Sequence, residues 1–323
     1  MRLSVALCTY NGVRYLDDQL SSLITQSRQP DELIISDDSS SDETVSLLQR
    51  FAANAGFPVH IFENESRLGS TQNFAHAIGL CNGDLIALCD QDDIWDKDKL
   101  QLTEECFIDN PEVSLVFTDA EIVDKDAQPL GYTLWESLRF DKTLQEQIRT
   151  PQAFELLNFR TLVTGATMAF RTEFRDLVLP IPDRIPLIHD GWIALMISLA
   201  GRLEPIDRPL MKYRQHAAQQ LGTPEIGAPP PASSLLMDSQ RRYDFASEIS
   251  KLTAVRQRLE ATKTRYKPME GEDLDSRLNH LTNRVEMKSQ RLGRFPIAFG
   301  ELFSGRYHRY SNGFYSFIKD LVK

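Results

Sequence analysis

The stretch Leu85-Ile86-Ala87-Leu88-Cys89-Asp90-Gln91-Asp92-Asp93 joins a short apolar run to three carboxylates. A continuous apolar run of this length is typical of a buried strand. A strand that ends in clustered Asp places oxygen ligands at the rim of a sheet, where open α/β folds bind their ligands. Asp90 and Asp92 project to the same side if the chain stays extended, and such carboxylates commonly hold Mg²⁺ or Mn²⁺ together with substrate phosphates. The alternative is an acidic turn that caps a helix beginning near Lys97.

Two earlier segments repeat the pattern of an apolar run followed by polar residues. Residues 3–8 precede Thr9-Tyr10-Asn11-Gly12, and residues 33–35 precede Ser36-Asp37-Asp38-Ser39-Ser40. Between them, residues 13–26 show the apolar spacing of a helix. This alternation of strands and helices predicts an α/β fold with a mostly parallel central sheet, flanked by helices, and a nucleotide-sized crevice at the carboxyl edge of that sheet.

Taken in order, these motifs resemble the signatures of the family 2 glycosyltransferases, which are inverting enzymes with the GT-A fold. The resemblance covers residues 1–220 and rests on Cys8-Thr9-Tyr10-Asn11, Ser36-Asp37-Asp38-Ser39-Ser40, Leu68-Gly69, Asp90-Gln91-Asp92-Asp93-Ile94-Trp95, Thr164-Gly165-Ala166-Thr167-Met168-Ala169-Phe170, His189-Asp190-Gly191-Trp192 and Tyr213-Arg214-Gln215-His216. The last three stretches fit the rhamnosyltransferase-like branch, and an ordered set is far more specific than any one motif. The family usually has Gly after the paired Asp of the second stretch. Here the residue is Ser39, so the nucleotide-contacting turn is expected to differ slightly.

The resemblance implies which residues bind the nucleotide sugar. They are Thr9, Tyr10, Asn11, Asp37, Asp38, Arg67 and Asp90. Tyr10 would stack on the base, Asp37 would accept a hydrogen bond from the pyrimidine imide, and Asp38 would brace the turn. The alternative for the two aspartates is N-capping of a helix starting near Asp42, and we expect one of them to fill that role. The alternative for Arg67 is a solvated surface position.

The resemblance also implies a divalent metal, Mg²⁺ or Mn²⁺, at the acidic strand end. Asp92 is the expected direct ligand, with Asp90 nearer the ribose. His216 could reach the metal from the far end of the domain, but a lone His is as often an ordinary core or surface residue.

Asp190 is the predicted catalytic base. In an inverting single displacement, one carboxylate removes the acceptor proton as the new bond forms, and no covalent nucleophile is needed. Asp190 precedes a run at 192–197 that predicts a buried helix, where a carboxylate is favoured by the helix dipole, so capping alone is the alternative. The predicted contacts to the acceptor or sugar are Trp95, His189 and Trp192. Core burial is the alternative for the two tryptophans.

The composition is that of an ordinary globular protein, with 41% apolar and 25% charged residues in 323. That length allows one large domain plus an appendage, or two domains. The four cysteines lack paired metal-ligand spacing, which predicts reduced core thiols and a reducing cytosol. No apolar run approaches the ~20 residues of a membrane span, and the chain opens on a strand rather than a signal peptide. We therefore expect a cytoplasmic protein, and the net charge of −10 argues against a nucleic-acid binder.

The chain is expected to divide into a GT-A glycosyltransferase domain at 1–221, a Pro/Gly/Ser-rich linker at 222–234 and a helical region at 235–323. Two amphipathic patterns around residues 267–271 predict an antiparallel helical hairpin. Its apolar seam could close on itself, on the body or on a second subunit of a homodimer.

The last forty residues, 284–323, are basic and aromatic. They carry a net charge of +5, against −15 for the rest of the chain, together with eight aromatic side chains. This composition suits peripheral contact with an anionic membrane on its inner face. A helix docked onto the body through its aromatic side is the equal alternative.

Other classes of protein fit less well. A dinucleotide-dependent oxidoreductase needs a Gly-rich first turn, and none of the sixteen glycines is two residues from another. The P-loop pattern is also absent. A nucleotidyltransferase is the nearest enzymatic rival, and a scaffold that binds a partner through its C-terminal helices is the non-enzymatic one. Within the family, the branch resemblance suggests dTDP-L-rhamnose as donor and a surface glycan, lipid-linked or not, as acceptor. UDP- or GDP-hexoses would need much the same carboxylates.

Overall fold

The computed structural model describes residues 1–216, 244–266, 273–289 and 293–322. Its contacts divide the chain into two units. The larger unit comprises Met1–Ile181 with Ile188–Asp238, and the C-terminal unit comprises Pro182–Leu187 with Ser239–Lys323. The predicted linker at 222–234 and the predicted break at 267–271 lie outside the described residues.

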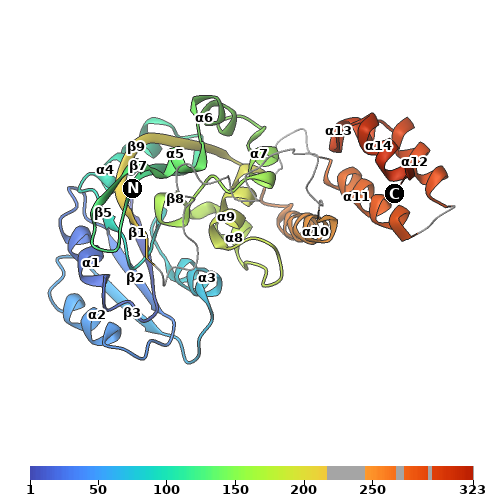
Figure 1. The fold of residues 1–323 in the computed structure, drawn as a ribbon. Helices are drawn as coiled ribbons and strands as arrows, with labels where there is room; N and C mark the ends of the chain where they lie inside the picture. Colours follow the sequence, from blue (N-terminus) through green and yellow to red (C-terminus); the bar gives the residue numbers. More distant parts are fainter. Residues whose placement is uncertain (217–243, 267–272, 290–292, 323) are drawn as a thin grey trace. The chain divides into compact units, whose positions relative to one another are not determined.

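The larger unit is built on one sheet (Figure 1), to which the described residues contribute nine strands in the order β3-β2-β1-β4-β8-β6-β9-β5, with β7 paired to β6. The strands are β1 (Leu3–Thr9), β2 (Glu32–Asp37), β3 (Val59–Glu63), β4 (Leu85–Cys89), β5 (Ile94–Trp95), β6 (Val113–Val123), β7 (Pro129–Thr133), β8 (Met168–Arg171) and β9 (Arg202–Arg214). The first four run parallel to one another. Strand β8 is antiparallel to both β4 and β6, and β9 runs parallel to β6. The sheet is therefore mixed, with its parallel half where the sequence predicts it.

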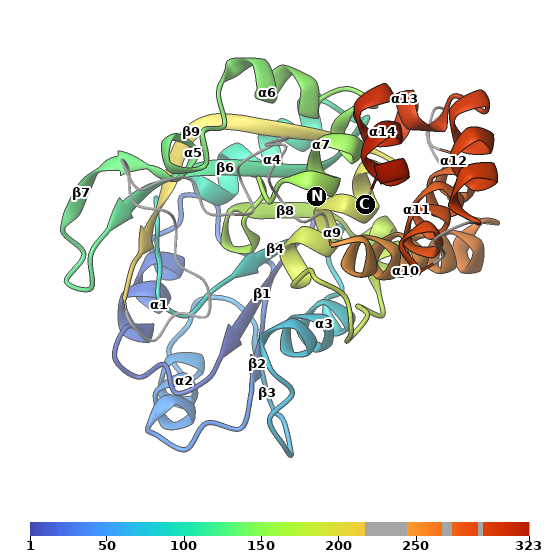
Figure 2. The same cartoon turned by 45° about the vertical axis from the view of Figure 1, so that its right-hand side comes forward.

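Helices connect the parallel strands and cover the sheet. They are α1 (Leu16–Ile24), α2 (Thr44–Ala52), α3 (Ser70–Leu80), α4 (Lys99–Asp109), α5 (Leu134–Leu138), α6 (Lys142–Ile148), α7 (Ala153–Phe159), α8 (Arg175–Val178) and α9 (His189–Ser198), with short 3₁₀ turns η1 (Gly165–Thr167) and η2 (Thr172–Phe174). Helix α3 packs against β1 and β2 and also contacts α9 (Figure 2). The predicted helices at 13–26 and 192–197 are present as α1 and within α9.

The core lies where the apolar runs of the sequence fall. All seven residues of β1 and all five of β4 are buried, as the continuous apolar pattern predicts for strands covered on both faces. Three of the four free thiols are buried here and beside α3. Burial raises the pKa of Cys81 to about 12, so this thiol is inert at neutral pH.

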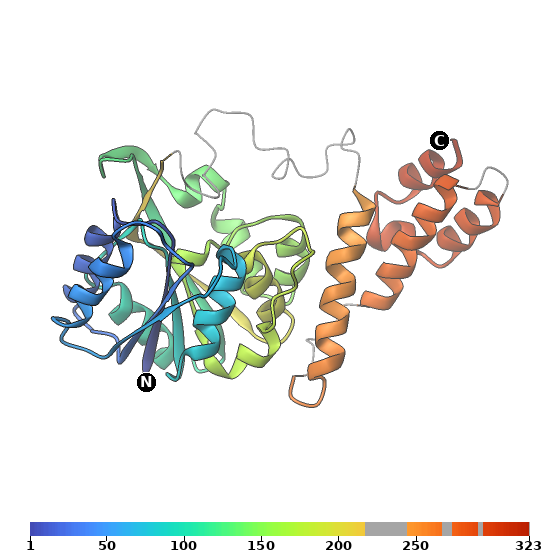
Figure 3. The same cartoon turned by 90° about the horizontal axis from the view of Figure 1, so that it is seen from below.

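The C-terminal unit is helical, as predicted. Its helices are α10 (Phe245–Thr262), α11 (Leu274–Ser289), α12 (Arg294–Phe303), α13 (Arg306–Tyr310) and α14 (Phe314–Val322). Helices α10 and α11 lie side by side (Figure 3), and α12 packs against α11, α13 and α14. The segment 182–187 joins this unit through a bond from Ser250 Oγ to the carbonyl of Arg184, 3.1 Å long. Among the described helices, none has the length and apolar character needed to cross a bilayer.

Candidate active site

The order of the strands determines where the site forms. From β1 the chain moves outward through β2 and β3, and β4 then returns to the other side of β1. The reversal between β1 and β4 is a topological switch point, where α/β sheets bind ligands outside the carboxyl ends of their strands. Thr9 pairs in register with Asp37, and Leu7 with Cys89. The three polar strand ends predicted from the sequence therefore meet at one edge.

Asp37 is fully buried at the end of β2 and holds the neighbouring turns together. Its Oδ2 accepts hydrogen bonds from Thr9 Oγ1 and Ser40 Oγ, both 2.7 Å, and its Oδ1 accepts from Ser40 N at 2.8 Å. A carboxylate has about four acceptor positions. Three of these positions are occupied by protein donors, and the predicted contact with a pyrimidine imide stays a prediction. Asn11 adds to this turn by accepting a bond from Ser41 N at 2.8 Å.

Asp38 is buried and fixes a different loop. Its Oδ1 accepts from Leu68 N at 2.6 Å, and its Oδ2 accepts from Gly69 N at 2.8 Å. Neither Asp37 nor Asp38 caps α2, whose N-cap is Glu43. The expectation that one of them fills the capping role is wrong, because both carboxylates are taken up by loops that converge on the sheet edge.

Gln91 clamps the end of β1 to the end of β4. Its Oε1 accepts from Tyr10 N at 2.8 Å, and its Nε2 donates to Tyr10 O at 3.1 Å. A Cβ at Gly12 would lie 2.1 Å from Gln91 Oε1, so a larger residue at that position would displace the Gln91 side chain from this clamp. The guanidinium of Arg67 lies 3.9 Å from the centre of the Tyr10 ring. Arg67 is itself exposed, and it covers one face of the ring predicted to stack on the base.

Ser39 occupies the position where the family usually has glycine. Its backbone has φ of 63°, in the left-handed region where glycine carries no steric penalty. The side chain of Ser39 is exposed. The turn therefore holds Ser39 in a conformation that glycine adopts without penalty, at a cost in strain.

Ser39→Gly should raise the free energy of unfolding by up to about 1 kcal/mol, since the left-handed strain of roughly 1–2 kcal/mol is relieved and partly offset by the greater freedom of glycine in the unfolded chain. Denaturant unfolding measures the change. Ala127→Gly is the matched control, because Ala127 has φ of 60° in a turn remote from β2. A loss of stability in the first variant alongside a gain in the second would show that the Ser39 side chain makes a stabilising contact.

The end of β9 brings His216 to the acidic cluster. His216 Nε2 lies 2.8 Å from Asp92 Oδ2, and the two side chains are only 10% and 15% exposed. Arg214 holds this arrangement, since its backbone N donates to Asp93 Oδ1 at 3.1 Å and its Nε donates to the carbonyl of Asp92 at 2.8 Å. The ring of Tyr15 contacts His216 at 4.6 Å between centroids. The structure therefore unites two of the three predicted metal ligands.

Asp90 and Asp93 differ from Asp92 in their surroundings. The Asp90 side chain has no hydrogen bond or ion pair to any described residue, and burial beside Asp92 and Asp190 raises its pKa to about 8. Asp93 is fully buried and uses only Oδ1, while its Oδ2 finds no partner among the described residues. Burial and the neighbouring carboxylates of Asp92 and Asp90 raise the pKa of Asp93 well above its usual value. A cluster of this kind favours either protons or a cation.

Asp190 lies in the first turn of α9 and is 6% exposed. Its Oδ1 accepts from Gly191 N at 2.6 Å and its Oδ2 from Gly165 N at 3.3 Å. Burial raises its pKa to about 6, against the lowering effect of these two backbone bonds. The N-cap of α9 is Ile188, so Asp190 does not cap the helix. Asp190 also contributes to the raised pKa of Asp90, which places the two carboxyl groups within electrostatic reach of each other.

The three predicted acceptor or sugar contacts are core residues. Trp192 is fully buried and its indole N–H donates to Val178 O at 2.8 Å. Trp95 is 3% exposed, with the ammonium group of Lys99 4.9 Å from its ring centre. His189 stacks on Phe74 at 4.1 Å, and burial lowers its pKa to about 3. Protein atoms enclose Trp192 and His189, whereas Trp95 also lines the cavity described below. The contact of these three side chains with acceptor or sugar stays a prediction.

Three residues of the site were given no role by the sequence. Gln91 lies between the aspartates of the acidic motif, but the sequence does not show that it binds the Tyr10 backbone. Arg214 lies inside a motif quoted above, but the sequence does not show that it binds Asp92 and Asp93. Lys99 is 2% exposed and donates to the carbonyl of Ala166 at 3.1 Å, in the turn whose Gly165 N–H binds Asp190. Burial lowers its pKa to about 8. A lysine next to an acidic motif is ordinarily expected to be exposed to solvent. The sequence therefore gives no indication that Lys99 is buried.

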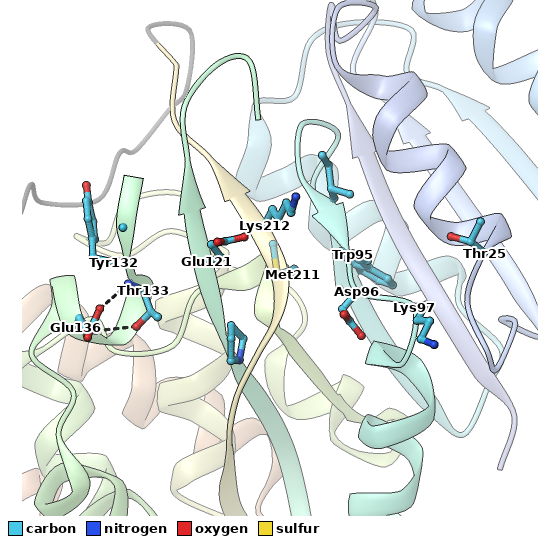
Figure 4. Close-up of a pocket in the computed structure, with 13 residues that line it drawn as sticks. Thr25, Trp95, Asp96, Lys97, Glu121, Tyr132, Thr133, Glu136, Met211 and Lys212 are labelled. Carbon is cyan, nitrogen blue, oxygen red and sulfur yellow. Dashed lines mark hydrogen bonds between the residues drawn. The ribbon is translucent and has the colours of Figure 1, made fainter. Parts of the chain in front are cut away.

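A separate cavity of about 770 Å³ lies over β5, β9 and β7 (Figure 4). Lys212 and Glu121 line it and pair across neighbouring strands, so they share one face of the sheet. Tyr213 is next to Lys212 and therefore points to the other face, where Asp93, Asp90, Asp92 and Asp190 contribute to its raised pKa. The cavity and the acidic cluster consequently lie on opposite faces. Trp95 alone of the predicted site residues lines this cavity.

The comparisons with known proteins agree with this geometry. The model of "Glycosyl transferase family 2" matches residues 4–172, which is more than half of the chain. The chain belongs to this family. Within the described residues, no group of three His, Cys, Asp or Glu side chains is arranged to hold a metal ion.

Relatives in the family include an "Uncharacterized glycosyltransferase" of Nostoc, 28% identical over 68% of this chain and 66% of its own length. The dTDP-rhamnosyl transferase RfbG of Shigella flexneri is 28% identical over 67% of this chain and 73% of its own. The putative teichuronic acid biosynthesis glycosyltransferase TuaG of Bacillus subtilis is 31% identical over 45% of this chain. The matched region thus spans about two thirds of the length of the first of these relatives.

Solved structures show the same fold. S. aureus TarS in complex with UDP-GlcNAc aligns with a TM-score of 0.56 at 15% identity, over 99% of this chain and 82% of that one. The mannosyltransferase PcManGT from Pyrobaculum calidifontis, in complex with GDP-Man and Mn²⁺, aligns with a TM-score of 0.51 at 16% identity, over 94% of this chain and 75% of that one. The GT-A-type fold predicted from the sequence is confirmed, and the chain carries a glycosyltransferase domain.

Proposed function

We propose that this domain transfers a sugar from a nucleotide-diphospho-sugar to a hydroxyl of a glycan acceptor by an inverting single displacement. The observation that carries the proposal is the position of Asp190. It is a buried carboxylate with a pKa of about 6, which accepts the Gly165 N–H and whose charge helps to raise the pKa of Asp90. A general base is most effective when its pKa lies near the working pH, and burial is how proteins raise a carboxyl into that range.

The best candidate for the donor is dTDP-L-rhamnose. Support comes from the motifs of the rhamnosyltransferase-like branch and from the relative RfbG, a dTDP-rhamnosyl transferase. UDP- and GDP-hexoses are the alternatives, since TarS and PcManGT were solved with UDP-GlcNAc and GDP-Man. Thermal-shift binding of a panel of nucleotide sugars tests the choice. A larger rise in melting temperature with dTDP-L-rhamnose than with UDP- or GDP-hexoses supports this donor. A larger rise with one of the hexoses makes that nucleotide sugar the better candidate.

The residues of this chain bind the nucleotide sugar and accept the proton of the acceptor. Asp37 accepts a hydrogen bond from the base at the strand end where Thr9 Oγ1 binds its Oδ2 and Gln91 holds the Tyr10 backbone. Arg67, held over Tyr10, contributes positive charge towards the diphosphate. Asp190 takes the proton of the acceptor hydroxyl as the oxygen attacks the anomeric carbon, and the bonds from Gly165 and Gly191 keep its carboxylate aimed during the step.

The donor set at the end of β4 fits a divalent cation, Mg²⁺ or Mn²⁺. Asp92 and His216 already approach each other at 2.8 Å, and the nearby Asp90 carboxylate has no protein partner within the described residues. Carboxylate oxygens and an imidazole suit Mn²⁺, with substrate phosphates and water completing the ligands. When bound there, the cation neutralises charge that develops on the departing diphosphate.

The acceptor and the setting are proposals of the same kind. We infer a surface-glycan acceptor, free or lipid-linked, because TuaG and RfbG are named for glycan-building transfers. The enzyme would act in the cytoplasm, peripherally on the inner face of the cell membrane. Association of two copies through the C-terminal helices is the alternative use of those helices.

The rate of transfer should fall as the pH drops through about 6, the pKa of Asp190. The protonated carboxyl cannot accept the acceptor proton, so activity is retained above this pH and lost below it. An aspartate with the ordinary pKa of about 3.9 would keep activity two pH units lower. Initial rates from pH 4.5 to 8 measure the midpoint, and donor affinity over the same range is the control. A midpoint near 4, or a fall that simply follows donor affinity, contradicts the assignment.

A further inference from the structure

The C-terminal unit leaves a set of large apolar side chains exposed to solvent. We call them the C-terminal aromatic face. They are Phe295, Phe299 and Phe303 of α12, and Phe314, Ile318 and Val322 of α14. Phe303 is 84% exposed and Val322 79% exposed, and the others are 44–56% exposed. Solvent exposure of so many large apolar groups on two short helices marks an interaction site.

The two halves of this face form one surface. On each helix the apolar side chains follow one another at intervals of four, which places them in a single stripe. Helix α12 packs against α14, and the ring of Phe317 lies between the stripes, 5.2 Å from Phe299 and 5.4 Å from Phe314. Phe317 itself is buried. The stripes therefore meet over Phe317 and present a continuous apolar surface.

The unit has its own core on the other side of these helices. Met287, Ala298, Tyr307 and Phe317 form a buried cluster. Two groups of polar bonds, one partly buried and one buried, add to it. Asp320 receives Arg284 Nε at 2.6 Å and Tyr307 Oη at 2.9 Å, while Glu301 pairs with His280 at 2.6 Å. The unit therefore has a buried core in addition to the exposed C-terminal aromatic face.

Basic side chains outnumber acidic ones in residues 293–322, which carry the face. Residues 293–322 contain two acidic side chains, Glu301 and Asp320, and both are buried in ion pairs. The basic side chains include Arg294 at the start of α12 and Lys319 on α14. An apolar stripe bordered by basic groups, with its acidic groups withdrawn into ion pairs, complements an anionic lipid surface.

We propose that the C-terminal aromatic face docks into the interfacial layer of an anionic membrane, with its phenylalanines at the headgroup boundary and Arg294 and Lys319 on the lipid phosphates. A second copy of the chain fits less well. A two-fold interface brings the same patch of each copy together, so it would set Arg294 and Lys319 against their own images with no exposed acidic partner in residues 293–322. The proposal goes beyond the transfer reaction and does not depend on which sugar is moved.

The test is sedimentation of the full chain with vesicles of phosphatidylcholine, with and without phosphatidylglycerol. The intact protein should bind the anionic vesicles, and binding should weaken as salt is added. The double variant Phe303→Ser/Val322→Ser removes the two most exposed apolar groups and should bind at least about tenfold more weakly. Lys319→Gln should weaken binding to anionic vesicles and leave the weak binding to neutral vesicles unchanged.

Ile108→Ser is the matched control, because Ile108 is 56% exposed on α4 of the larger unit. It should bind vesicles like the unchanged protein. Both variants should keep the melting temperature, since each replaces an exposed group. The inference is overturned if the intact protein ignores anionic vesicles at low salt, if the double variant binds as well as the control, or if sedimentation velocity shows a dimer that the double variant abolishes. Hydrolysis of the soluble donor reports separately on the proposed catalysis and should be equal in all variants.

Discussion

Asp190→Asn should lower the rate of sugar transfer by about 10²–10⁴-fold, the usual contribution of a general base. Asparagine keeps the size of the side chain and one acceptor for the N–H groups of Gly191 and Gly165. It has no affinity for the acceptor proton. Donor binding should survive, because the nucleotide contacts lie at the ends of β1 and β2. The melting temperature should change little, since the variant no longer buries a charge whose pKa is raised by burial.

Single-turnover transfer, donor affinity and thermal unfolding should be measured on this variant together. Asp17→Asn provides the matched control, because Asp17 is an exposed aspartate in the first turn of α1. A purely structural role for Asp190 predicts the opposite pattern. Stability would then fall by about 1 kcal/mol, the usual net contribution of one lost hydrogen bond, while turnover per folded molecule would stay near that of the control.

The parallel half of the sheet could be predicted because its signal is local. Strands β1 and β4 are continuous apolar runs, and a strand buried on both faces requires that pattern. Strand β3 was not predicted, since it lies at the edge of the sheet and alternates with exposed His60 and Glu63. The pairing of β4 with β8 could not be predicted either. It joins segments more than eighty residues apart, and no local pattern reports the direction of such a pairing.

The acidic side chains of the site were predicted from the motif, but their partners were not. Motif letters identify chemical groups, whereas hydrogen bonds depend on how distant loops pack. The capping role expected for Asp37 or Asp38 failed because the loop carrying Leu68 and Gly69 supplies better donors for Asp38. Likewise, Trp192 was read as a ring available to a sugar, yet it lies on the all-round apolar helix α9, which is buried on every side.

Asp92→Ala should abolish divalent-metal-dependent transfer and leave the fold intact. Fold retention is expected because Arg214 binds the backbone carbonyl of Asp92, and that bond survives the substitution. The lost carboxylate would remove the predicted direct ligand and leave His216 without its partner at 2.8 Å. Charge stabilisation by a bound cation is worth several kcal/mol, so the rate should drop by more than about a hundredfold.

The measurements for Asp92 are Mn²⁺ binding by calorimetry and the rate of transfer against Mn²⁺ concentration. Asp109→Ala, which removes an exposed aspartate at the end of α4, is the control and should behave like the unchanged protein. His216→Gln should weaken Mn²⁺ binding less than Asp92→Ala, because an amide removes the imidazole ligand and leaves the charged one. Full activity of the unchanged enzyme after EDTA treatment would show that transfer does not require a cation at Asp92 and His216. In that case their mutual hydrogen bond would be structural, and the raised pKa of Asp90 would reflect a carboxyl that remains protonated at neutral pH.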